Sequence, residues 1–415
     1  MSPEHTEVTT AHEGGTPDPG YPFPLPTALD APPAWERLRG GCPVAPVRFP
    51  SGDGALLLTR YDDVKRVLAD PRATRDMAAD DAARITATET GGVFNDSMAT
   101  SLAAAGHLRW RRMLNRWFTA KRVAALRPGM ETMAERLVDA MLADGAPADL
   151  KARVGFPLPV WVICDLLGVP EADRDRFAHW SDMMLNLDRY RQEQIEAGGA
   201  EFRAYMAAHI DAKRDAPGDD LLGSLLTAAD PDGAVLTDDQ LIATGQALLI
   251  AGHETTANMI GKMMAMLLAE PARWRRVTAD PTPALVRTTV EEILRYDANA
   301  GFGMPRYLTE DIEVGGAVLP RGATVVCSMA AANRDDAAFE DASALRLDRT
   351  PNPHLTFGVG PHSCLGQSLA RTELATVLTV LARRLPSLAL AVPADELRPV
   401  EGLLVGGLRE LPVRW

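Results

Sequence analysis

One cysteine stands in a glycine-rich segment that precedes a helical pattern. The segment reads Phe357-Gly-Val-Gly-Pro-His-Ser-Cys364-Leu-Gly366. Its first two glycines allow a tight loop with inward-facing backbone amides, because glycine adopts positive φ at little cost. The pattern predicts a helix over 365–385 with Cys364 at its N-terminus, where amides and the helix dipole stabilise a thiolate. A thiolate is a strong metal ligand, whereas the alternative is a core cysteine beside a turn.

A second group of reactive side chains lies in the middle of a long helical pattern. The stretch Ala251-Gly-His-Glu254-Thr255-Thr256 places a carboxylate beside a hydroxyl, a pair that can relay protons. The pattern runs over 238–269, and Thr237 with Gln240 forms a capping box at its start. A helix of that length, roughly 48 Å, would cross the whole domain. The alternative is a helix kink whose polar groups are satisfied internally.

Two other hydrolytic motifs are incomplete, and the four cysteines do not pair in sequence. H-E-x-x-H fails because Ala257 occupies the second histidine position, and G-x-S-x-G fails because Ala370 replaces the final glycine. Cys42, Cys164 and Cys327 are far from Cys364 and from one another. A zinc site or a disulfide framework is therefore not expected.

Two further pairs have helical spacing. Glu292 and Arg295 are at i and i+3, and His107 and Arg111 are at i and i+4, so each pair shares one helix face. An ordinary surface ion pair is the simpler interpretation of the first pair. Helical patterns over 107–118, 123–143, 157–167, 171–187, 191–214 and 284–296 surround these residues, and β-like segments concentrate after residue 306.

The cysteine segment matches the signature F-G-x-G-x-H-x-C-x-G at every specified position, and the chain after about Pro22 resembles the bacterial cytochrome P450 family. The resemblance implies a mainly α fold with small β-sheets. It also implies haem b with Cys364 as the axial iron ligand, and a proton relay made by Glu254 and Thr255. Haem contacts are implied for four further residues: His107, Arg111, Arg306 and His362.

The resemblance also assigns Glu292 and Arg295 to a structural ion-pair network behind the haem. In the family a third cation comes from the irregular stretch before the cysteine loop. By ungapped alignment that position is Ala344 here. Two alternatives remain: Arg346 supplies the missing charge, or the network is a pair only.

A substrate pocket is implied around the haem, mostly apolar with few polar anchors. Its candidate residues come from five regions, and each could equally be plain core: Phe94, Met98, Met184, Leu248, Ala251, Asn299, Phe302 and Leu404.

Electrons would come from NAD(P)H through a reductase and a ferredoxin. The candidate docking surface is a basic stretch in an otherwise acidic protein, made of Arg109, Arg112, Arg116, Lys121 and Arg122. A basic stretch can also be no more than a solvated face.

Composition narrows the class of protein. The 415 residues are 46% hydrophobic and carry a formal net charge of −13, which disfavours nucleic-acid binding. No run of 18 apolar residues exists, so no membrane helix is expected. We expect a disordered leader over 1–21, one domain over 22–415 and a cytoplasmic location.

The predicted function is oxygen-dependent oxidation, by hydroxylation, of a small secondary metabolite. Epoxidation and oxidative C–C or C–N coupling are alternatives within the same family. A haem-based sensor or carrier is an alternative of another class, which would need the Cys364 loop but neither a proton relay nor a donor-docking surface. The sequence does not specify the substrate.

Overall fold

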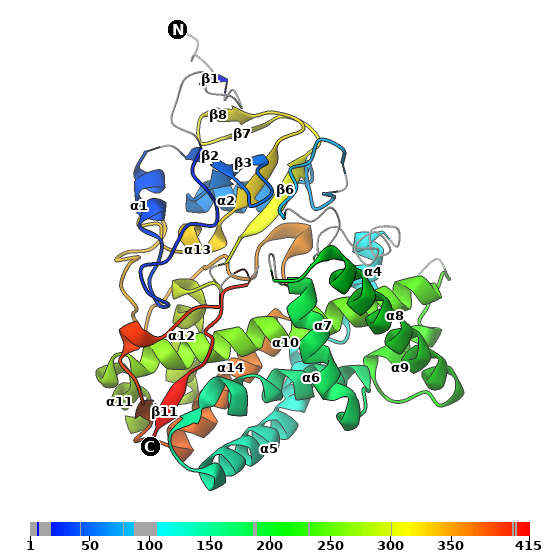
Figure 1. Cartoon of the computed structure of the whole chain (residues 1–415), viewed down its shortest axis with the longest axis vertical. Coiled ribbons are helices and arrows are strands. Elements are labelled where there is room, and N and C mark those ends of the chain that lie inside the picture. Colours follow the sequence, from blue (N-terminus) through cyan, green and yellow to red (C-terminus); the bar gives the residue numbers. More distant parts are fainter. Residues whose placement is uncertain are drawn as a thin grey trace.

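A β-rich part and a larger helical part lie on either side of one long central helix in the computed structural model (Figure 1). The described residues are 6–7, 18–41, 43–77, 79–86, 106–185, 189–230, 233–299, 301–400, 402 and 405–415. In this part of the chain no helix is long and apolar enough to cross a membrane.

The largest sheet joins the two ends of the chain. Its strand order is β2-β3-β9-β6-β4, with β2 Val44–Arg48, β3 Gly54–Leu58, β9 Thr324–Cys327, β6 Met304–Leu308 and β4 Ala73–Thr74. Strands β3 and β9 are parallel, and the other pairs are antiparallel. Two small sheets have the orders β1-β8-β7 and β10-β11-β5, with β1 Thr6–Glu7, β8 Ala317–Leu319, β7 Ile312–Val314, β10 Ala389–Leu390, β11 Pro412–Arg414 and β5 Ala148–Asp149.

Helices make up most of the described chain, as expected. They are α1 Pro33–Gly40, α2 Tyr61–Ala69, α4 His107–Asn115, α5 Ala120–Asp144, α6 Pro157–Leu167, α7 Arg174–Leu185, α8 Gln192–Asp215, α9 Leu221–Thr227, α10 Asp238–Leu268, α11 Pro271–Ala279, α12 Pro283–Tyr296, α13 Met329–Ala332 and α14 Gln367–Arg384. Helices α1, α9, α11 and α13 were not expected from the sequence pattern. A π-helical turn, Lys151–Gly155, precedes α6.

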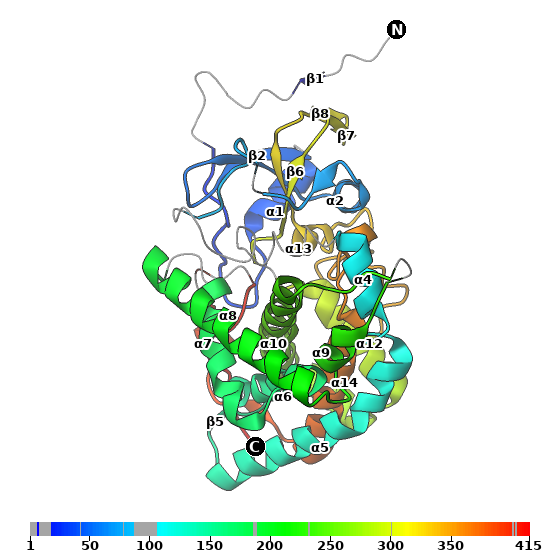
Figure 2. The same ribbon diagram turned by 90° about the vertical axis from the view of Figure 1, so that its right-hand side faces the viewer.

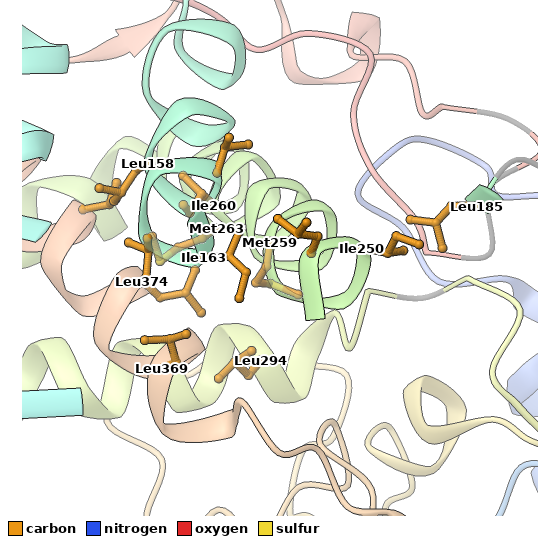
Figure 3. Close-up of a cluster of buried hydrophobic side chains, with 14 of the residues drawn as sticks. Leu158, Ile163, Leu185, Ile250, Met259, Ile260, Met263, Leu294, Leu369 and Leu374 are labelled. Carbon is orange, nitrogen blue, oxygen red and sulfur yellow. The ribbon is translucent and has the colours of Figure 1, made fainter. Parts of the chain in front are cut away.

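Helix α10 is the centre of the helical part, and in Figure 2 it is seen nearly end-on. Its predicted capping box is present: Thr237 Oγ1 accepts from the Gln240 amide, and Gln240 Oε1 accepts from the Thr237 amide. Its side chains Met259, Ile260 and Met263 lie in one apolar cluster with side chains of α6, α12 and α14 (Figure 3): Leu158, Ile163, Leu294, Leu369 and Leu374. Burial of this size holds α10 in place far more strongly than its caps do.

Gly252 of α10 serves this packing. A Cβ atom at Gly252 would lie 2.8 Å from the side chain of Ile163, so the glycine lets α6 approach the helix. Its neighbour Ala251, in contrast, is exposed in the middle of an otherwise buried helix.

The domain begins before residue 22, which corrects the expected boundary. Tyr21 is 3% exposed, and its hydroxyl donates to the Phe302 carbonyl at 2.6 Å. The backbone before it pairs with Arg48, whose amide donates to the Pro19 carbonyl. Thr6–Glu7, within the predicted leader, pair with β8. The rest of the leader lies outside the described residues.

Candidate active site

The cysteine loop has the tight turn that its glycines predicted. Gly358 and Gly360 have φ of +64° and +75°, values that side-chain-bearing residues rarely adopt. A Cβ atom at Gly360 would lie 2.9 Å from Ala69 Cα, so this glycine also lets the loop approach α2. The Cys364 amide donates to the Phe357 carbonyl at 2.7 Å, which closes the turn.

Cys364 lies just before α14 rather than in its first turn, because the helix begins at Gln367 with Gly366 as its N-cap. The thiol is exposed. Desolvation by the surrounding protein nevertheless raises its pKa, while the Gly366 amide, Arg111 and Arg371 act in the opposite direction. The amides and cations alone therefore do not produce a thiolate. A bound metal ion would, because a coordinating thiol is deprotonated by the charge of the metal.

Four predicted haem contacts lie together beside this loop. The rings of His107 and His362 have centroids 4.0 Å apart. Arg111 donates to Ser363 Oγ at 3.2 Å, and Arg306 is 2% exposed with no hydrogen-bond partner for Nε. The buried Nδ1 of His362 also has no partner.

Arg75 belongs to the same cluster and was not predicted. Its neighbours follow from the strand register, since Ala73 pairs with Leu308 and Thr74 with Tyr307, which brings Arg75 level with Arg306. Burial and the charge of Arg306 lower the pKa of Arg75 to about 10. The pairing of β4 with β6 is a tertiary feature, so the sequence alone gave no reason to select Arg75.

The cluster lacks counter-charges. Burial, followed by the charges of His107, Arg75, Arg306 and Arg111, lowers the pKa of His362 to about 3. Among the described residues, no carboxylate is bonded to any member of the cluster. A buried cation with an unpartnered nitrogen, as in Arg306, is costly. A group that carries two carboxylates, such as haem with its propionates, would satisfy the cluster, and the orphaned nitrogens of Arg306 and His362 fit it.

The polar residues of α10 are anchored to backbone groups. Thr255 Oγ1 donates to the Ala251 carbonyl at 2.8 Å, a bond that loosens a helical ladder. Asn299, at φ +49°, donates to the Thr255 carbonyl at 2.8 Å. Glu254 accepts from Asn258 at 3.0 Å. Thr255 therefore stands at a weakened point of the helix, next to the exposed Ala251.

The ion-pair network behind the cysteine loop has three charged members, and its third member is the cation Arg349. Glu292 accepts from Arg295 at 2.8 Å and from Arg349 at 3.0 Å, and all three residues are buried. Arg346 contributes only its backbone amide to Glu292, because its side chain turns outward to Glu340 and Asp341. Both sequence alternatives, Arg346 or a pair only, are thus corrected.

A second, unpredicted group braces the aromatic start of the loop. Glu291 accepts from Arg371 at 2.6 Å and lies 3.0 Å from His354 Nε2. The Arg371 guanidinium lies 4.4 Å from the centre of the Phe357 ring. Burial alone would raise the pKa of Glu291, but these two partners outweigh it and lower the pKa to about 2.

The predicted pocket residues divide into three groups. Ala251 and Asn299 lie at the site, and Leu248 is next to them on α10 at 8% exposure. Phe302 has no exposed surface and packs against Tyr21 and Phe49, and Met184 is also core. This corrects the expectation that Phe302 contacts a substrate. Three candidates lie outside the described residues: Phe94, Met98 and Leu404.

Some residues of the basic surface on α4 and the start of α5 contact other residues of the same chain. Arg112, Arg116 and Lys121 are exposed. Arg109 pairs with Asp230 at 2.5 Å, and Arg122 lies 3.5 Å above the Trp117 ring. The free charge of this surface is therefore smaller than the sequence suggested.

A cysteine ligand on a glycine loop, a cluster of unpaired cations and a hydroxyl–carboxylate pair on a long helix define a haem-thiolate oxidoreductase. Comparison with known proteins agrees with this class. The sequence profile of the family Cytochrome P450 matches residues 283–389. The chain belongs to the cytochrome P450 family and is a monooxygenase.

Its relatives and structural neighbours cover nearly the whole chain. It is 41% identical over 400 residues to nocardicin C N-oxygenase of Nocardia uniformis subsp. tsuyamanensis, covering 95% of this chain and 98% of that protein. It is 40% identical to mycinamicin IV hydroxylase/epoxidase of Micromonospora griseorubida, with coverage of 95% and 98%. The crystal structure of mycinamicin VIII C21 methyl hydroxylase from the same organism superposes with a TM-score of 0.88 at 31% identity, covering 96% of this chain and all of that one.

Membership of the family implies haem, and the residues fit it. Cys364 would be the iron ligand. Arg75, His107, Arg111, Arg306 and His362 would hold the propionates.

Proposed function

We propose that this monooxygenase hydroxylates a small secondary metabolite with molecular oxygen, using electrons from NAD(P)H that arrive through a reductase and a ferredoxin. The observation that carries the proposal is the weakened, polar turn of α10 at Ala251 and Thr255, in a protein that also presents an exposed Cys364. When bound, haem supplies the redox and oxygen chemistry.

In this proposal Thr255 and Glu254 relay protons to the reacting oxygen. Because the Thr255 hydroxyl donates to the Ala251 carbonyl, its oxygen keeps lone pairs that can accept a hydrogen bond from a proton donor. The side chain of Glu254 is 14% exposed, so its carboxylate can exchange protons with water. A sensor or carrier would need neither residue.

The relatives support the substrate class. Their names describe oxidation of nocardicin C and of mycinamicin IV, which are natural products. Leu248, Ala251 and Asn299 are the described residues that we propose face the substrate. Epoxidation is a second candidate reaction, because the mycinamicin IV enzyme is named as both a hydroxylase and an epoxidase.

The test of the relay uses the purified holoenzyme with a substrate found by spin-state titration across natural-product scaffolds. Thr255→Ala should divert most NAD(P)H consumption from product to hydrogen peroxide. Thr256→Val is the matched control, because it changes the neighbouring buried hydroxyl and keeps its volume. Retained coupling in Thr255→Ala, or equal uncoupling in the control, would refute the relay.

The ferredoxin docking surface is proposed at Arg112, Arg116 and Lys121. Charge reversal at Arg112 or Arg116 should slow reduction of the enzyme, and the difference from wild type should shrink at high salt. Arg153→Glu, an exposed arginine outside this surface, is the control. Unchanged stopped-flow reduction rates in the α4 variants would exclude this site.

A further inference from the structure

His253 is a buried histidine in α10 whose ring orientation is fixed by the backbone. It has no exposed surface, and its Nδ1 lies 2.6 Å from the Leu249 carbonyl oxygen. A carbonyl only accepts hydrogen bonds, so Nδ1 carries the hydrogen in the neutral ring. Nε2 therefore carries a lone pair, and this buried atom has no hydrogen-bond partner within the described chain.

The unpartnered nitrogen faces Glu254. The distance from His253 Nε2 to Glu254 Oε2 is 4.0 Å, longer than a hydrogen bond but within reach of a small side-chain rotation. The edge of the Phe156 ring covers the imidazole, with ring planes at 88° and centroids 5.6 Å apart. This aromatic cover leaves Glu254 as the polar group that Nε2 faces.

The two oxygens of Glu254 have different roles. Oε1 accepts from Asn258 Nδ2 at 3.0 Å. Asn258 lies close to Gly407, where a Cβ atom would be 2.3 Å from its Oδ1. Because Oε1 already has an amide donor, Oε2 is the oxygen free to carry a proton, and it is the oxygen that faces His253.

Charges from several elements act on this pair. Lys151 precedes α6, and burial lowers its pKa while Glu254, Asp149 and Asp182 raise it. On α10, Lys262 is paired with Asp297 at 2.8 Å, so its charge is compensated. Desolvation lowers the pKa of His253, and the charge of Glu254 opposes that shift. The imidazole is therefore disfavoured as a free cation.

We propose that His253 is a positioning residue for Glu254, and that the two side chains hold one proton between Oε2 and Nε2. The inference rests on the relay role proposed above for Glu254. When the proton leaves Oε2 towards Thr255, the pair is left with the negative charge of the carboxylate. It is reloaded by a proton from water that reaches the partly exposed Glu254.

Infrared spectroscopy of the resting holoenzyme tests the shared proton without any turnover. A pH titration should show the carboxyl band of Glu254, assigned by its loss in Glu254→Gln, changing together with an imidazole band at one common midpoint. His253→Leu should shift the carboxyl band and move its midpoint by about one pH unit, a tenfold change in proton affinity. His253→Gln restores an acceptor and should return the band position without the imidazole band.

His209→Gln is the matched control, because His209 is also bonded to a backbone carbonyl but lies on α8. An unchanged carboxyl band and midpoint in His253→Leu would overturn the proposal, as would separate midpoints in the wild type or a His253→Gln band that stays shifted as in His253→Leu. If His253→Leu does not fold, the common midpoint of the wild type decides.

The infrared result is separable from the relay. If Thr255→Ala and Glu254→Gln keep full coupling, the relay is refuted, whereas the shared proton stands or falls on the infrared bands. If both hold, His253→Leu should raise the fraction of electrons lost to hydrogen peroxide several-fold, and His253→Gln should raise it less.

Discussion

Two sets of polar and charged side chains flank the cysteine loop, and they differ in how completely their hydrogen-bonding and charged groups are paired. Behind the loop, Glu292 is surrounded by Arg295, Arg349 and Asn352, and Arg295 also donates to three backbone carbonyls. Beside the loop, Arg75 and Arg306 repel each other and keep His362 neutral, and no described carboxylate is bonded to any of the three. In the first set the chain itself supplies the partners of the charged groups, whereas the second set needs a bound anion to balance its cations.

The difference separates stability from binding. A buried charge cluster that the protein satisfies itself contributes to holding elements together, here α12 against the irregular stretch at 333–352. A cluster that the protein leaves unsatisfied costs stability, and it persists because a ligand compensates it. Substitutions in the two sets should therefore have opposite effects on the haem-free fold.

The largest effect is expected in the satisfied set. Arg349→Ala would leave the fully buried carboxylate of Glu292 short of one partner, so the free energy of unfolding should fall by about 3–5 kcal/mol. Chemical denaturation of the holoenzyme, followed by far-UV circular dichroism, measures the loss. A decrease under about 1 kcal/mol would mean that Arg349 is not a member of the network.

The next largest effect should be opposite for two quantities, the stability of the haem-free protein and its retention of haem. Arg306→Met removes one unpaired cation, so the haem-free protein should be as stable as wild type or more stable. Haem retention should weaken by about tenfold, roughly 1.4 kcal/mol, because a propionate loses its partner. Thermal unfolding of the haem-free protein and transfer of haem to apomyoglobin measure the two quantities. Loss of stability in the haem-free variant would contradict the comparison.

A pH-dependent effect should come from Glu291. Its folded pKa of about 2 lies below the ordinary value of 4.5, so its contribution to stability is present above pH 4.5 and disappears as the pH falls towards 2. Glu291→Gln should therefore flatten the acid side of the stability curve, with the larger loss relative to wild type at neutral pH. Denaturant midpoints between pH 3 and 7 test this, and parallel curves for the two proteins would disprove it.

The smallest effect is expected at Arg346. Its side chain is 43% exposed and pairs with two exposed acids, so Arg346→Ala should change the free energy of unfolding by less than about 0.5 kcal/mol. It removes the same type of side chain as Arg349→Ala, three positions away, and is the matched control. Similar losses in both variants would show that the irregular stretch, not the Glu292 contact, sets the stability.

Local chemistry made part of the site predictable. The glycines of the cysteine loop and the capping box of α10 act over a few residues, and the structure confirms both. Arg349 was missed because the chain before it follows turns rather than a regular repeat, so ungapped alignment placed the cation at Ala344. Arg75 depends on the register of β4 against β6, and Phe302 depends on Tyr21. Such contacts join residues more than 200 positions apart, and the spacing of hydrophobic residues in the sequence does not predict them.

The contact between Tyr21 and Phe302 also has a consequence for biosynthesis. The two residues are 281 positions apart, so the segment around Tyr21 leaves the ribosome long before its partner is translated. At about 5–20 residues per second, that interval lasts on the order of half a minute. The first part of the described domain to be made thus remains without this partner until Phe302 has been translated.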